Sequence, residues 1–156
     1  MDIETRNKIV SAVLGIIIIV LGYFLYGAIV KPYQKVIEQQ RMTEKVRHQM
    51  SNVRDALVQY KAKNEEFPEN LDTLVAFLKS DSLMKARGDS LFSPLRPGEK
   101  YKPDSMIYSP RPPKERFKYT LVDTIRPNLY LLEDPGSDDH IGHTTKTTWL
   151  NAASWE

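Results

Sequence analysis

The sequence predicts an α+β protein in which a single N-terminal transmembrane helix continues into a long amphipathic helix, and that helix packs on a small antiparallel β-sheet. Three patterns favour this fold class: an uncharged apolar stretch near the N-terminus, apolar residues at helical spacing after it, and two short β-like runs further on. We therefore expect an anchor at residues 1–32, a soluble domain at residues 33–136 and a polar C-terminal tail at residues 137–156.

The length and composition exclude several classes of function. A chain of 156 residues has room for one small soluble domain once a membrane segment is set aside. Lys and Arg number 22 against 20 Asp and Glu, a balance that does not predict a nucleic-acid-binding surface. Cysteine is absent, which excludes thiol catalysis, thiolate metal sites and disulfides. Neither a phosphate-binding glycine loop nor a serine nucleophile motif occurs, so we expect no enzymatic activity.

Residues 9–30 form the predicted anchor, because they carry no charge and lie between Lys8 and Lys31. At about 1.5 Å rise per residue, such a helix crosses a hydrocarbon core of about 30 Å. A cleaved signal peptide is the main alternative, but its apolar core is typically only about 7–15 residues long. The sequence Lys31-Pro32-Tyr33 also lacks the small residues of a cleavage site. A buried helix of a soluble domain is the remaining alternative.

Small residues within the anchor fall near one stripe of the helix. Ser11 and Gly15 are four positions apart, and Gly15 and Gly22 are seven apart. Such a stripe lets a second transmembrane helix approach closely, so these three residues are candidates for an interface. The alternative is that glycine is simply common in membrane helices.

A second helical stretch is predicted at residues 33–63, after a kink or a restart of the helix at Pro32. Its apolar residues step by three and four positions along one helix face: Met42, Val46, Met50, Val53, Leu57 and Tyr60. This stripe could be a coiled-coil seam, but it is regular over too short a length, and packing on the protein's own sheet is favoured.

A turn around Phe67-Pro68 and a short helix follow, and Asn70 is the expected N-cap of that helix. Periodicity is lost after Ser80, and six prolines between residues 92 and 114 exclude long regular elements there. The β-like runs are residues 116–122 and 128–132, joined by a hairpin-sized loop. Residues 106–108 are a candidate third strand.

The tail at residues 137–156 is polar but contains Trp149 and Trp155. Two exposed tryptophans are unfavourable in water, so we expect them to dock on the domain or on a partner, and we count both as interface candidates. The surface that receives them cannot be derived from the sequence.

Candidate metal ligands lie in and before the same tail. His140 and His143 could share a transition metal, although no third ligand is in helical register with them. Asp134, Asp138 and Asp139, with Ser137, could instead bind calcium through a flexible, oxygen-rich loop. The spacing does not match the twelve-residue EF-hand pattern, and a solvated acidic turn without any cofactor is the default expectation.

The segment from Tyr60 to Pro68 reads Tyr-Lys-Ala-Lys-Asn-Glu-Glu-Phe-Pro and is followed by Leu71-Asp-Thr-Leu74. It resembles the type IV pilin and type II secretion pseudopilin superfamily, where a Tyr-x-x-x-Asn-Gly-x-Tyr/Phe-Pro segment closes the long helix and a Leu-x-x-Leu helix follows. Glu65 stands where the family usually has Gly, and the prepilin-peptidase signature is missing. We therefore expect a pilin-like relative that is not processed.

The resemblance implies a non-enzymatic structural subunit in the bacterial inner membrane with its soluble domain in the periplasm. Its partners would be the lipid bilayer and other integral membrane proteins, in a hetero-oligomeric or filament-like assembly. The flanking charges favour the opposite topology, because more Lys and Arg follow the apolar stretch than precede it, but long domains weaken that rule. The alternative function is an accessory single-helix subunit of a respiratory, photosynthetic or transport complex.

Overall fold

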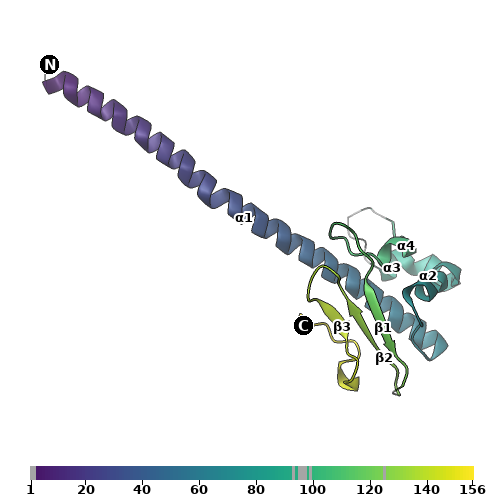
Figure 1. Ribbon diagram of the computed structural model, residues 1–156. Helices are drawn as coiled ribbons and strands as arrows, with labels where there is room; N and C mark the ends of the chain where they lie inside the picture. Colours follow the sequence, from purple (N-terminus) through teal and green to yellow (C-terminus); the bar gives the residue numbers. More distant parts are fainter. Residues whose placement is uncertain (1–2, 93, 95–97, 99, 125) are drawn as a thin grey trace. The chain divides into compact units, whose positions relative to one another are not determined.

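The computed structural model describes residues 3–92, 94, 98, 100–124 and 126–156. These residues form two compact units, Met1–Arg41 and Met42–Glu156, and each is considered by itself. Figure 1 labels the helices α1 to α4 and the strands β1 to β3.

Helix α1 spans Ile3–Asn64 and contributes to both units. It is continuous through residue 32, so the predicted restart of the helix at Pro32 is wrong. An interior proline removes one backbone donor, and a helix can continue past it, often with a kink.

The first unit contains the apolar part of α1. An 18-residue window there has a mean hydropathy of 2.6, and none of that window is buried within the protein. Its large apolar side chains are exposed, for example Ile19 and Phe24. Helix α1 is therefore long enough and apolar enough to cross a membrane.

The second unit is built around the amphipathic part of α1. Val46, Met50, Val53 and Leu57 are fully buried in its core, while Met42 and Tyr60 at the ends of the stripe are partly buried. The spacing of the apolar residues therefore identified the buried face of this helix correctly.

Three short helices follow, α2 (Leu71–Ser80), α3 (Ser82–Leu91) and α4 (Pro103–Met106). Asn70 caps α2 as predicted, because its side chain accepts a hydrogen bond from the backbone N–H of Thr73 at 2.8 Å. Helix α3 was not predicted. Its apolar pattern is weak, with only Met84 and Gly88 buried, and Asp81 starts it by accepting hydrogen bonds from Leu83 and Met84.

The sheet has three antiparallel strands in the order β1-β2-β3, with β1 at Lys118–Val122, β2 at Leu129–Glu133 and β3 at His140–Gly142 (Figure 1). Tyr119 pairs with Leu132, and Leu132 pairs with Ile141 on the other side. The two β-like runs of the sequence are therefore confirmed as strands.

The predicted third strand at residues 106–108 is wrong. Met106 ends α4, and Tyr108 forms only an isolated bridge with Arg116, because the prolines on both sides limit the backbone donors available for a ladder. The third strand comes instead from the segment at residues 137–156, which also holds the 3-10 helix η1 (Thr147–Trp149). The boundary expected at residue 136 thus falls inside the second unit.

Aromatic residues join α1, the turn after it and the sheet in one core. Phe67 meets Tyr130 edge to face with ring centroids 4.8 Å apart. The hydroxyl of Tyr119 donates to the carbonyl of Pro68 at 2.9 Å. The Phe67-Pro68 turn is thereby fixed against β1 and β2, which holds the end of α1 to the sheet.

Candidate interaction site

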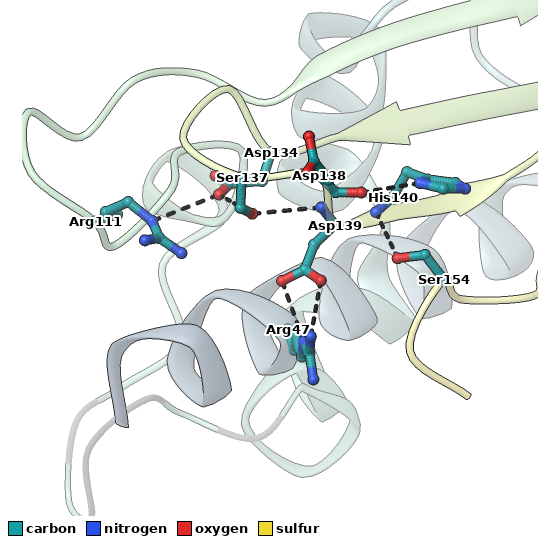
Figure 2. Close-up of polar contacts among 8 residues, drawn as sticks. All are labelled: Arg47, Arg111, Asp134, Ser137, Asp138, Asp139, His140 and Ser154. Atoms are coloured by element: carbon teal, nitrogen blue, oxygen red, sulfur yellow. Dashed lines mark hydrogen bonds and ion pairs between the residues drawn. The ribbon is translucent and has the colours of Figure 1, made fainter. Parts of the chain in front are cut away.

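An acidic turn, residues 134–139, connects β2 to β3 (Figure 2). The N–H of Asp134 donates to the carbonyl of Asp139 at 3.0 Å, which closes the turn. The hydroxyl of Ser137 donates to Asp134 Oδ2 at 2.8 Å inside it. The turn is therefore an ordered structure held by its own hydrogen bonds.

Asp139 binds Arg47 of α1 with both carboxylate oxygens (Figure 2). Arg47 Nε lies 3.1 Å from Oδ2 and Nη2 lies 2.9 Å from Oδ1, a geometry typical of strong arginine–carboxylate pairs. The hydrogen bond to Asp139, which outweighs desolvation, raises the pKa of Arg47 above its ordinary value. This pair attaches the acidic turn directly to the long helix.

Asp134 faces a second arginine. Arg111 Nε lies 3.6 Å from Asp134 Oδ2, and the Asp134 side chain is fully buried. A Cβ at Gly136 would lie 2.7 Å from Arg111 Cδ, so glycine at that position leaves room for the arginine. Asp134 Oδ1 has no hydrogen-bond partner among the described residues, and Arg111 supplies the nearby positive charge.

The residues predicted as metal ligands make other contacts or are exposed in this structure. Asp134 and Asp139 face arginines, and Asp138 is exposed, with its carbonyl 3.1 Å from His140 Nδ1. His143 Nδ1 instead accepts hydrogen bonds from the backbone of Thr145 and Lys146. Across the described ranges, no group of three or more His, Cys, Asp or Glu side chains is arranged to hold a metal ion.

The C-terminal segment packs on the rest of the second unit. Ala153 bridges to Ile141 of β3, and the ring of Trp155 lies 5.2 Å from the Arg47 guanidinium carbon. Glu156 pairs with Arg54 of α1 at 3.2 Å. Trp155 is therefore partly buried on the domain, one of the two outcomes expected for it, and its role at an interface with a partner stays a prediction.

Trp149 has a different position. Its side chain is 51% exposed, with Lys146 over one face and His143 at its edge. The protein itself covers only part of this ring, and the role of Trp149 at an interface stays a prediction.

The small residues of the anchor lie in the first unit. A Cβ built on Gly15 or Gly22 would meet nothing within 4 Å, and Ser11 is exposed. Within the first unit, the described residues therefore leave this helix face free, and its use as an interface stays a prediction.

A pocket of about 530 Å³, which was not predicted from the sequence, lies on the second unit. Met42, Lys45, Gln49 and Asn52 line it from one face of α1, beside the core stripe. The other walls come from the segments around α4 and from the turn before β1: Phe92, Pro94, Lys100, Tyr101, Lys102, Ser105, Met106, Tyr108, Ser109, Pro110 and Lys114. We call this site the lysine pocket.

The sequence contained one signal for the lysine pocket, a second helical stripe at positions 42, 45, 49 and 52. The residues of the opposite wall follow no regular period, because they lie on short segments interrupted by prolines. Comparison of the chain with models of protein families, with curated proteins and with solved structures found no significant match.

Proposed function

We propose that the protein is a non-enzymatic, single-pass membrane protein whose second unit engages other proteins of a membrane assembly. The observation that carries this proposal is the apolar part of α1, where a window of mean hydropathy 2.6 has no buried residue. Such a surface is unfavourable in water and favourable in a bilayer, where the helix satisfies its own backbone hydrogen bonds.

Aromatic residues support the placement in a bilayer. Tyr23, Tyr26 and Tyr33 are exposed near the C-terminal end of the apolar stretch. Tyrosine is enriched at the boundary between lipid and water, where its ring sits in the headgroup region. The membrane-spanning part would therefore end close to these residues.

The pilin-like interpretation has a narrower basis. In the second unit a long helix packs on an antiparallel sheet, the Phe67-Pro68 turn contacts that sheet, and Tyr60 at the end of the stripe meets Phe77 of α2. We propose on this basis a pilin-like subunit of a bacterial inner-membrane assembly, with the second unit in the periplasm. An accessory subunit of another membrane complex is the second candidate, because the free face at Gly15 and Gly22 suits a neighbouring membrane helix.

Purification in mild detergent tests this function. The protein is expressed in its native membrane, cross-linked in place and isolated, and the cross-linked residues are mapped by mass spectrometry. Cross-links from the second unit to defined sites on membrane proteins are expected. Recovery of the protein as a monomer, with no reproducible cross-link at any site, would contradict an interaction role.

A further inference from the structure

We propose that the lysine pocket binds an acidic segment of a partner protein, with one apolar side chain inside the pocket and carboxylates against its rim. This inference rests on the proposed function and names the surface that such a partner would use. It is derived from the charge and the lining of the pocket.

Four lysines surround the opening of the pocket. Lys45, Lys100, Lys102 and Lys114 are all exposed, and the lining residues that the structure describes include no carboxylate. Within the described ranges none of these four amines forms an ion pair, whereas other lysines of the unit do, including Lys63 with Asp81 and Lys79 with Asp104. Four unpaired positive charges around one opening attract an anionic partner.

The floor of the pocket is apolar and aromatic. Phe92 and Tyr101 are stacked with centroids 4.8 Å apart, and Gly88 lets Tyr101 approach α3, since a Cβ there would lie 2.7 Å from the ring. Met42 and Met106 complete this floor. Flexible methionines next to aromatic rings accept apolar side chains of different shapes.

The amide of Gln49 and the hydroxyl of Tyr101 are buried in the wall of the pocket. Gln49 Nε2 donates to the carbonyl of Ser105 at 3.0 Å, which fixes the orientation of that amide. The hydroxyl of Tyr101 has no hydrogen-bond partner in the described part of the chain, and burial raises the pKa of Tyr101, so the group stays protonated.

The arrangement of the charges favours a peptide over a small molecule. Sites for small organic ligands bury most of the ligand and place a few polar groups that converge on it. Here the four lysines come from three separate segments and stay exposed. A chain with one apolar anchor and carboxylates before and after it matches that distribution.

The test measures binding of fluorescein-labelled ten-residue peptides to the full chain in mild detergent by fluorescence anisotropy. Each peptide has four Asp or Glu residues around one central Phe, Trp, Leu or Met, and a matched set has Asn and Gln instead. At least one acidic peptide is expected to bind, and its amide counterpart to bind about tenfold more weakly or worse.

Variants locate the binding. The double substitution Lys45→Glu and Lys114→Glu should weaken binding by about tenfold or more, whereas Lys45→Arg with Lys114→Arg should retain it. The control is Lys85→Glu with Lys118→Glu, which changes the net charge equally at exposed lysines outside the pocket. Peptide binding to this control variant should stay within about twofold of the wild type, because exposed charges outside the pocket are screened by salt.

Three results of the peptide assay would overturn the inference: no lysine-dependent binding by any acidic peptide, equal losses in pocket and control variants, or full competition by inorganic phosphate whatever the central residue. The last result would identify a small-anion site. Cross-linking in native membranes separates this inference from the proposed function. If the pocket variant keeps every cross-link of the wild type, the pocket proposal fails while the interaction role stands.

Discussion

The guanidinium of Arg47 and the carboxylate of Asp139 form a two-point pair, with 2.9 Å between Nη2 and Oδ1 and 3.1 Å between Nε and Oδ2. The two residues are 92 positions apart, and the pair connects the long helix to the turn that precedes β3. The Asp139 side chain is 11% exposed and that of Arg47 40% exposed. The contact therefore lies where charge interactions are stronger than on an open surface.

A double-mutant cycle with Arg47→Gln and Asp139→Asn should give a coupling energy of about 1–2 kcal/mol in thermal unfolding of the full chain in detergent. The pair of Arg126 and Glu66 is the control, because both side chains are largely exposed, at 72% and 56%. That cycle should give less than about 0.5 kcal/mol. Equal coupling in both cycles would show that the Arg47 pair has no special role in attaching the turn.

Gly142 of β3 should not tolerate alanine. Its φ of +86° disfavours any Cβ, and a Cβ there would lie 2.2 Å from the carbonyl oxygen of Tyr130. Gly98 also has a positive φ, but a Cβ there would meet none of the described residues within 4 Å. Gly142→Ala should therefore lower the melting temperature clearly more than Gly98→Ala, and equal effects would argue against β3 as part of the sheet.

Leu57→Ala should destabilise the second unit by about 2–5 kcal/mol, because it leaves a cavity under a fully buried side chain. Val58 is the next residue on the same helix and is 38% exposed. Val58→Ala should change stability by less than about 0.5 kcal/mol. Chemical denaturation followed by circular dichroism measures both stability changes. Similar values for the two variants would show that Leu57 does not lie on the buried face of α1.

Acid should weaken the start of α3 through Asp81. The hydrogen bond from Lys63, followed by that from the Met84 N–H, lowers the pKa of Asp81 below its ordinary value of 3.8. A lowered pKa in the folded state gives stability that is fully present above the ordinary value and is lost as the pH falls through the folded pKa. Asp81→Asn should therefore lower the melting temperature at pH 7, and this difference should shrink steadily below pH 4. A difference that does not change with pH would contradict the charged role of Asp81.

The sequence predicted those elements whose residues follow a simple period. The helical stripe from Val46 to Leu57 and the alternation in β1 reflect burial on one face, which leaves a direct trace in the sequence. Helix α3 has no such trace because it buries little and depends on the Asp81 cap. Strand β3 has only three residues and is defined by pairing with β2 and by the bridge to Ala153, which are contacts between segments far apart in the sequence.

The candidate sites also combine features that the sequence reveals with features that depend on the folded chain. The acidic residues at 134–139 were recognisable as one cluster, but their use was not, because Arg47 and Arg111 come from other parts of the chain. The lysine pocket has walls from several segments, so only its α1 face could be recognised in the sequence. Pairing partners and pockets are properties of the folded chain.

The central claim is that the apolar part of α1 is retained as a membrane anchor. The direct test is intact-mass measurement of the protein that remains in the membrane pellet after alkaline carbonate extraction. We expect the chain to stay in the pellet at its full mass of 18.0 kDa. A soluble chain shortened by the apolar segment would show instead that this helix is a cleaved signal sequence and not an anchor.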